Sequence, residues 1–400
     1  MQAPETHAVL DALGGEARFV GGAVRNALIG EPVADVDIAT PLVPEEVMRR
    51  LTAAGLRAVP TGIEHGTITA VANGTPYEVT TLRRDVETDG RRAVIAFTAD
   101  WREDALRRDF TMNALYADRE GVVYDYFGGI ADLQARRVRF VGDARARIRE
   151  DYLRILRLFR FHAWYGRGEL DSEALDASVA EKTGLKKLSG ERVQKELLRL
   201  LEAKDPLPSL EAMLRTQILA EILPGEIDLP RLRRLLSIEE ANALVPDAVL
   251  RFSALLPDSK PALRSVAGQL RLSNAIRDRL IAAADADSRI GAALSHAEAR
   301  QLIYRLGGAC FRDQVLRQWA GSGAPADDAS WRALLTLSQT WKPPIFPLDG
   351  NDVMAIGIEE GRQIGIALRD AESWWIDRDF QPDRAALLQH LKNIVTKPRV

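Results

Sequence analysis

The N-terminal part of the chain combines a glycine pair, an arginine and two carboxylates over a short distance. Residues 17–20 are typical of a short strand, and residues 23–29 of a helix with one apolar face. Gly21 and Gly22 lie between them and allow the sharp turn that joins the two elements. Such a junction leaves the backbone N–H groups at the helix N-terminus free, and Arg25 adds a positive charge nearby. The sequence therefore predicts a binding site for a polyphosphate.

Two carboxylates, Asp35 and Asp37, follow on a predicted second strand over residues 35–39. Alternate residues of a strand point to the same face, so the two carboxylates are expected side by side while Val36 and Ile38 enter the core. Carboxylates placed in this way can hold a pair of Mg²⁺ ions, about 3.5–4 Å apart in such sites. The pair thus indicates a metal site beside the expected polyphosphate.

Two other interpretations fit parts of this segment. A dinucleotide-binding fold is disfavoured because the G-x-G-x-x-G pattern is absent and no acidic residue ends a second parallel strand. A solvated turn after Pro32 would explain a lone D-x-D, but it leaves the glycine–arginine turn without a role.

The first third of the chain alternates short strands with helices, and the remainder is almost wholly helical. Asn73-Gly74 between two of the strands is a strong signal for a two-residue hairpin turn. From about residue 147 onward the apolar residues recur with a helical period. Strands are expected at 17–20, 35–39, 67–72, 76–82, 93–97, 113–118 and 122–126, and helices between them at 23–29 and 44–54.

A third carboxylate, Glu78, lies on the predicted strand 76–82. It alternates with the apolar Val79, so it faces away from the core and can join the two aspartates. The alternative is a surface glutamate on an edge strand. Residues 85–92 follow and are expected to form a charged, glycine-containing turn.

An arginine pair precedes an aspartate in the segment 107–114. Arginine donors suit a triphosphate, and a carboxylate such as Asp109 can accept a hydrogen bond from a ribose hydroxyl. Strand alternation predicts that Phe110, Met112 and Ala114 point inward and that the polar residues between them face the other side.

A single helix carrying both acidic and basic residues is expected around residues 148–161. Its buried stripe comprises Ile148, Tyr152, Ile155 and Phe159. Its charged face comprises Glu150, Arg154 and Arg157, flanked by Asp151 and Arg160. A carboxylate there can accept from the exocyclic amine of cytosine or adenine, and an arginine can donate to the ring acceptors beside it. Uracil and guanine present a carbonyl and a ring N–H at those places, so both would be rejected. The alternative is a ladder of salt bridges along the helix.

Arginines are concentrated between residues 136 and 167. Ten arginines stand there against Asp143, Glu150 and Asp151, so the local charge is 10 − 3 = +7. The arginines are at positions 136, 137, 139, 145, 147, 149, 154, 157, 160 and 167. Such a segment in a mildly acidic protein predicts a surface that faces phosphates.

Composition places the chain among ordinary globular proteins with several domains. Its 400 residues carry 54 basic and 57 acidic side chains, for a net charge of −3, which argues against a nonspecific nucleic-acid coat protein. One cysteine cannot form an internal disulfide or a cysteine-built metal site. The sequence lacks a signal-peptide pattern and an apolar run long enough to span a bilayer, so a cytoplasmic location is expected.

The glycine–arginine turn, the D-x-D pair, the RRD segment and the E-D-x-x-R helix together resemble the class II nucleotidyltransferases. These enzymes build or repair the 3′ CCA end of tRNA, and bacterial poly(A) polymerases are their relatives. The resemblance implies an α+β, polymerase-beta-like head, residues 1–140, which is catalytic. It implies an all-α remainder comprising a neck at 141–205, a body at 206–340 and a tRNA-binding tail at 341–400. Implied partners are tRNA, CTP and ATP, with Mg²⁺ as the cofactor and no membrane.

The resemblance also implies roles for individual residues. The catalytic carboxylates would be Asp35, Asp37 and Glu78, and the first two would bind metal. The nucleotide contacts would be Gly22, Arg25, Arg108, Asp109, Asp151, Arg154, Arg157 and Arg160. An E-R-x-x-x-E run would support the base-reading helix through Glu191, Arg192 and Glu196.

This chain departs from the family pattern at two positions. Asn26 stands where the family usually has aspartate, and we expect this to change only a local interaction at the start of the helix. Tyr152 replaces the usual proline after the aspartate of the E-D-x-x-R motif, which is expected to change the stiffness of the helix start more than its chemistry.

The expected activity is the addition of C, C and A to the 3′ end of tRNA from CTP and ATP, with release of pyrophosphate. A poly(A) polymerase or a partial enzyme that adds only CC or only A is the alternative within the family. A catalytically inactive RNA-binding protein is an alternative of another class, but the intact D-x-D argues against it. A nucleotidyltransferase acting on small antibiotic-like molecules would leave the long helical remainder unexplained.

Overall fold

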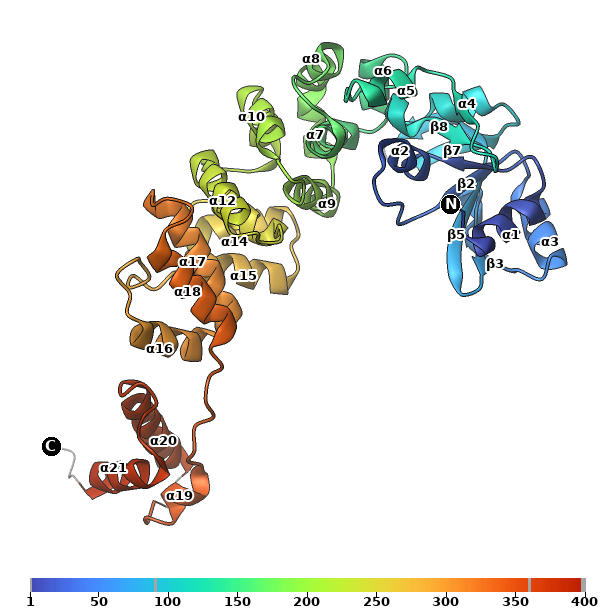
Figure 1. Ribbon diagram of the computed structural model, residues 1–400. Helices are drawn as coiled ribbons and strands as arrows, with labels where there is room; N and C mark the ends of the chain where they lie inside the picture. Colours follow the sequence, from blue (N-terminus) through green and yellow to red (C-terminus); the bar gives the residue numbers. More distant parts are fainter. Residues whose placement is uncertain (1, 90–91, 359–360, 397–400) are drawn as a thin grey trace. The chain divides into compact units, whose positions relative to one another are not determined.

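A computed structural model describes residues 2–89, 92–358 and 361–396 (Figure 1). The chain divides into two compact units. The first comprises Met1–Gly225 together with Gln269–Arg271, and the second comprises Glu226–Gly268 together with Leu272–Val400. The first unit contains the sheets and the second is helical, which confirms the predicted α+β head followed by a helical remainder. The finer boundaries near 140, 205 and 340 stay predictions.

A seven-stranded sheet forms the centre of the head. Its strands are β1 (Arg18–Val20), β2 (Asp37–Thr40), β3 (Arg57–Gly62), β4 (Thr67–Ala72), β5 (Thr75–Thr81), β8 (Leu115–Ala117) and β9 (Val123–Asp125). They lie in the order β3-β4-β5-β2-β1-β8-β9. Strands β2 and β5 are parallel, and the other neighbouring pairs are antiparallel.

Short helices pack on this sheet. The helices α1 (Pro4–Leu13) and α3 (Pro44–Ala53) contact the β3–β5 side, and α2 (Gly22–Ile29) contacts β1 and β8. Ile38, Ile68 and Val79 are fully buried in the core. The helices α4 (Trp101–Leu106) and α5 (Gly129–Gln134) complete the head. This framework positions the start of β2 beside β5, where the acidic residues are found.

Strand β2 begins at Asp37, so the expected strand over 35–39 was wrong for its first two residues. Asp35 lies in an irregular segment, and it is exposed. A strand needs a paired neighbour on at least one edge, and the pairing of β2 begins at Ile38 opposite Phe19 of β1 and at Asp37 opposite Glu78 of β5. The two carboxylates are therefore held by different kinds of backbone, a loop and a strand.

The predicted hairpin at Asn73-Gly74 is confirmed. Both residues have positive φ, 49° and 80°, and they join Ala72 of β4 to Thr75 of β5. These are the dihedrals that a two-residue hairpin turn of this type requires.

The expected turn over 85–92 was wrong. The chain forms two paired strands, β6 (Arg83–Asp89) and β7 (Arg92–Phe97), in a separate two-stranded sheet. The hydrogen bonds between β6 and β7 join backbone groups, so they do not depend on the side-chain charges that suggested a turn. The connecting residues 90 and 91 of the expected turn lie outside the described residues.

The segment before β8 is also not the alternating strand that we expected. Thr111–Asn113 form a short 3₁₀ helix, and Thr111 and Asn113 are buried along with their apolar neighbours. The Thr111 hydroxyl donates to the buried Asp132 at 2.7 Å, so its polar group is satisfied inside the core. Hydrogen bonding inside the core thus overrides the simple alternation.

The single helix expected around 148–161 is two helices, α6 (Ala144–Glu150) and α7 (Leu153–Tyr165). Asp151 between them is extended, and its Oδ1 accepts from the backbone N–H of Leu153 at 3.1 Å. This local side-chain bond replaces the helical one and breaks the run. The predicted continuous stripe was therefore wrong: Ile148 belongs to α6, while Tyr152 is only partly buried.

The rest of the first unit consists of α8 (Ser172–Glu181), α9 (Gly190–Leu201), α10 (Leu207–Arg215) and α11 (Ile218–Ile222). The second unit contains α12 (Leu229–Ala241), α13 (Ala248–Leu255), α14 (Lys260–Gln269) except for its last residue, α15 (Asn274–Ala284), α16 (His296–Leu306), α17 (Gly308–Ser322), α18 (Ala329–Thr340), α19 (Gly350–Met354), α20 (Gly361–Ile376) and α21 (Arg384–Thr396). Within the described residues, every helix is too short or too polar to cross a membrane.

Candidate active site

Asp37 and Glu78 are direct neighbours in the parallel pair β2–β5, where they are register partners. Burial raises the pKa of Asp37, and the negative charges of Glu78 and Asp35 raise it further, while Arg108 opposes the shift. Both of the other predicted catalytic carboxylates, Glu78 and Asp35, therefore act on Asp37 at the beginning of β2. Among the charged groups that act on Asp37, Glu78 and Asp35 are negative and Arg108 is positive, so the site concentrates negative charge.

The donor chemistry of this cluster fits a divalent cation. Carboxylate oxygens are the ligands that Mg²⁺ prefers, and a bound cation would relieve the repulsion that raises the pKa of Asp37. Among the described residues, however, no three acidic, histidine or cysteine side chains are already gathered closely enough to enclose a metal. The cluster therefore fits a divalent cation in its chemistry, although the described residues do not form a complete three-ligand site.

The helix α2 begins directly after Gly21, which lies close to Arg108, the arginine whose charge acts on Asp37. Gly21 has φ +65° and ψ −121°, a conformation that L side chains rarely adopt. A Cβ atom on it would lie 3.6 Å from the backbone oxygen of Asn113 and 3.7 Å from Nη1 of Arg108. No side chain caps the helix, so the backbone N–H groups that start at Gly22 are suited to a phosphate oxygen.

Arg25 is only 7% exposed and is held by neutral groups. Its Nη2 donates to the Tyr165 hydroxyl at 2.8 Å, its Nη1 donates to Oδ1 of Asn113, and its Nε donates to Oδ1 of Asn26 at 3.1 Å. Burial lowers the pKa of Arg25 because it removes water from the charged guanidinium, while Tyr165 and Asp109 oppose the shift. Most of its donors are therefore engaged by groups inside the protein, which hold the guanidinium in one orientation.

Asn26 does more than the local helix-start contact that we expected. Its Oδ1 accepts from Arg25, and its Nδ2 donates to the backbone oxygen of Pro32 at 2.8 Å. An aspartate could make the first contact but not the second, because an ionised carboxylate has no donor. Asn26 thus ties Arg25 to the segment that carries Asp35.

Arg108 is anchored by a buried carboxylate, Asp104 of α4. Its Nη2 lies 2.9 Å from Oδ2 of Asp104, and its Nε donates to the Tyr116 hydroxyl at 3.2 Å. The neighbouring Arg107 binds the other oxygen of Asp104 at 2.8 Å. Burial would raise the pKa of Asp104, but Arg108 and Arg107 outweigh it and hold the pKa well below its usual range.

Sequence reasoning missed Asp104. Its spacing of three and four residues from the two arginines is the signal that could have revealed it.

Asp109 accepts from two sides. Arg157 donates to its Oδ2 through Nε at 2.8 Å, and Asn113 donates to its Oδ1 through Nδ2 at 2.9 Å. Burial alone would raise the pKa of Asp109, but Arg157, Asn113 and the backbone N–H of Phe110 lower it to about 2. Since Asn113 also binds Arg25, it links the glycine turn to the RRD segment. Asn113 lies in the segment 107–114, but the sequence pattern did not indicate this linking role.

The network continues into α9. Glu196 lies 3.8 Å from Arg157 and accepts from Nε of Arg160. The connected chain of contacts runs through Arg25, Asn113, Asp109, Arg157, Glu196 and Arg160. The support that we expected from Glu196 is thus a direct contact to two of the candidate nucleotide residues.

The other two candidate base-reading residues have separate partners. Arg154 donates to Oε2 of Glu150 at 2.6 Å and to the backbone oxygen of Arg107 at 3.1 Å. Asp151 accepts from Arg192 of α9 at 2.7 Å. The contact to Arg107 joins α7 to the RRD segment through the backbone.

Four arginines of the basic segment 136–167 are paired with acidic residues that lie outside it, so the net charge of this surface is lower than the local count of +7; that it faces phosphates stays a prediction. Asp132 pairs with Arg137 and Arg139, and Glu181 pairs with Arg145 and Arg149. These acids lie outside the counted segment, which is why a local count missed them. His162 is buried on α7, and both of its ring nitrogens have partners, the Ser209 hydroxyl and the backbone oxygen of Gly168.

Comparisons with known proteins show which family this chain resembles. The family model described as "Poly A polymerase head domain" matches residues 17–139, and the model described as "Probable RNA and SrmB- binding site of polymerase A" matches residues 169–227. The chain is 34% identical over 394 residues to "CCA tRNA nucleotidyltransferase 1, mitochondrial" of Mus musculus, covering 94% of this chain and 86% of the relative. It is 32% identical over 390 residues to the "CCA-adding enzyme" of Levilactobacillus brevis, covering 95% of this chain and 94% of the relative.

Among solved structures, the Bacillus stearothermophilus CCA-adding enzyme in complex with CTP is similar at a TM-score of 0.75. The two chains are 28% identical, and the match covers 99% of this chain and 98% of that one. The similarity therefore extends over both units and is not limited to the head.

Proposed function

Because this chain belongs to the family of CCA-adding nucleotidyltransferases, we propose that it adds C, C and A to the 3′ end of tRNA from CTP and ATP and releases pyrophosphate. The observation that carries this proposal is the register of Asp37 with Glu78 on parallel strands, beside Arg108 and the uncapped start of α2. The head thus contains both the carboxylates that can bind metal ions and the hydrogen-bond donors that can bind a triphosphate.

The residues of the head would divide the transfer between them. Asp35 and Asp37 would hold Mg²⁺, which supplies stabilisation for the attacking and leaving oxygens of an in-line displacement. The N–H groups from Gly22 onward, together with Arg108, would bind the triphosphate. Asp104 would keep Arg108 charged and oriented through its buried carboxylate.

Base choice would rest on side chains of the α6–α7 region. A carboxylate such as Asp151 can accept from the exocyclic amine that cytosine and adenine share, and Arg154 can donate to the ring acceptors. Asp109 and Arg157 already form a fixed pair, so they support the pocket from the RRD side.

The same base-reading side chains would accept both C and A, so they would not determine how many nucleotides are added. We infer that the end of synthesis is set by the fit of the growing 3′ end against a tRNA held by the helical remainder. A poly(A) polymerase remains the second candidate, since one matching family model carries that description.

The test is single-nucleotide extension. The protein is incubated with Mg²⁺, one labelled nucleoside triphosphate at a time, and tRNAs lacking the last one, two or three nucleotides. We expect each tRNA to be completed to CCA and then extended no further at high ATP. A ladder of long A tails on an unstructured RNA primer would instead identify a poly(A) polymerase.

The cellular compartment also stays a prediction. We propose a cytoplasmic location, as the sequence suggested, while the relative from Mus musculus is named as mitochondrial. Fractionation of cells that express the tagged chain would decide between these locations.

A further inference from the structure

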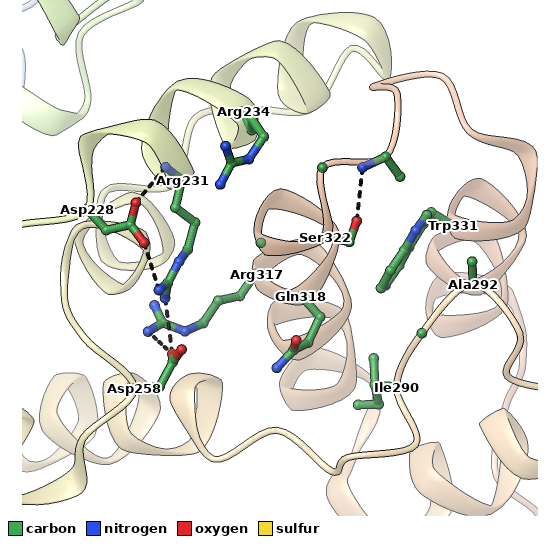
Figure 2. A pocket seen from close by; sticks show the side chains of 14 residues that line it. Asp228, Arg231, Arg234, Asp258, Ile290, Ala292, Arg317, Gln318, Ser322 and Trp331 are labelled. Atoms are coloured by element: carbon green, nitrogen blue, oxygen red, sulfur yellow. Dashed lines mark hydrogen bonds and ion pairs between the residues drawn. The ribbon is translucent and has the colours of Figure 1, made fainter.

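The second unit contains a cavity of about 690 Å³ that belongs to no part of the candidate active site. Its wall includes Arg231 and Arg234 of α12 and Arg317 of α17, with Asp228 and Asp258 beside them. Figure 2 shows Arg231 and Arg317 reaching from the two helices to the same place next to Asp258. A cavity of this volume is in the range that takes a small ligand.

The buried arginine has donors left over. The side chain of Arg317 is 2% exposed. Its Nη2 donates to the backbone oxygen of Leu256 at 2.9 Å and also to Asp258. Within the described part of the chain, its Nε and Nη1 are buried and have no hydrogen-bond partner. Buried donors are nearly always paired in folded proteins, so two open ones on a single guanidinium call for an acceptor.

The charges in the wall favour an anionic acceptor. Asp258 is shared, because one of its oxygens lies 3.0 Å from Arg231 and also accepts from Arg317. Asp228 lies 2.8 Å from Arg231. Three arginines against two aspartates leave one positive charge. Burial lowers the pKa of Arg317, and the neighbouring Arg231 lowers it further, so an anion placed there would stabilise the charged form.

We propose that this cavity binds a small free phosphate anion, inorganic phosphate or pyrophosphate, through Arg317, Arg231 and Arg234. A terminal phosphate offers three acceptor oxygens to guanidinium donors that come from two helices. A phosphodiester of RNA carries a sugar on each side and would have to bring both to an almost fully buried guanidinium. A wall with a single net positive charge is also weak for holding a polyanion.

The experiment measures the thermal stability of the full chain as inorganic phosphate or pyrophosphate is titrated without Mg²⁺, with ionic strength held constant by NaCl. A ligand that binds only the folded state raises the melting temperature in a saturable way. The test variant is Arg234→Gln, since Arg234 is only partly buried and donates through Nε to the backbone oxygen of Ala320. The control is Arg277→Gln, an exposed arginine that pairs with the adjacent Asp278.

We expect a saturable shift in the wild type and in Arg277→Gln, and binding at least tenfold weaker in Arg234→Gln. Arg317→Gln should remove the shift in melting temperature. If Arg317→Gln does not fold, Arg234→Gln still tests the proposal. Equal shifts in all variants would mean that phosphate binds elsewhere, and no shift in the wild type would mean that water satisfies Arg317. Both results overturn the proposal. A third result would also overturn the proposal. If Arg234→Gln weakened tRNA binding in a filter-binding assay, while free phosphate did not change the melting temperature of the wild type, the cavity would be assigned to RNA.

Discussion

Arg157 of α7 holds Asp109 of the RRD segment, with its Nε 2.8 Å from Oδ2. The two residues are far apart in the sequence, and their contact joins the head to the helix expected to read the base. Asn113 fixes the other oxygen of Asp109, so the carboxylate is bound on both sides. A candidate ribose contact is thus part of the framework that holds α7 in place.

Asp109→Asn should reduce the free energy of unfolding at pH 7 by about 2–3 kcal/mol, because Arg157 loses a charged partner in a largely buried site. The lowered pKa, about 2, means that this contribution is full above about pH 4 and is lost as the pH falls towards 2. The difference between wild type and variant, measured by calorimetry, should therefore shrink over that range. Glu202→Gln, which removes the exposed partner of Arg199, serves as control. A difference that stays constant down to pH 2 would contradict the pairing.

Glu78→Gln should lower the pKa of Asp37. Glu78 is the second cause of the raised pKa, after burial, so the value should move towards normal without reaching it. The measurement is an NMR titration of the Asp37 side-chain carboxyl without metal, with the surface variant Glu120→Gln as control. An unchanged pKa of Asp37 would show that the two carboxylates do not interact across β2 and β5.

Asp35→Ala and Asp37→Ala should each abolish nucleotide incorporation, while the affinity for tRNA changes little. Losing a metal ligand removes several kcal/mol of transition-state stabilisation, which corresponds to a rate loss of about 100-fold or more. Incorporation is measured on a tRNA lacking its CCA end, and tRNA affinity by filter binding. Turnover at the wild-type rate in either variant would remove that residue from the metal site.

Arg154→Ala should weaken the choice between CTP and UTP. The loss of one hydrogen bond from a charged donor should cost about 1.5–3 kcal/mol for the correct base. Arg149→Ala is the matched control, because Arg149 pairs with Glu181 at the surface and should affect only tRNA binding and its salt dependence. The observable is the ratio of UTP to CTP incorporation, and an unchanged ratio in Arg154→Ala would exclude its part in base reading.

Asn26→Ala should lower kcat more than it raises the KM for CTP, because both Arg25 and the segment that carries Asp35 lose a common anchor. Its stability should fall by about 1–2 kcal/mol. Asn26→Asp should lie between the alanine variant and the wild type, since it keeps the acceptor for Arg25 but loses the donor to Pro32. Steady-state kinetics and thermal unfolding measure both effects. If Asn26→Asp matched the wild type in both, the bond to Pro32 would have no role.

Local features of this protein were predictable from the sequence alone. The hairpin at Asn73-Gly74 follows from backbone dihedrals that few residues adopt, and the glycine turn before α2 follows from the same restriction. The helical remainder follows from the apolar period. These features depend on residues that are close in the chain, so a sequence pattern contains the necessary information.

Tertiary structure decided which charged groups meet. Asp132 and Glu181 neutralise arginines that a local count left unpaired, and Asp104 fixes Arg108. The break at Asp151 depended on one side chain competing with the helix for a backbone donor. The physical reason is that an ion pair or buried hydrogen bond depends on distance and burial in space, and a one-dimensional pattern records neither of them.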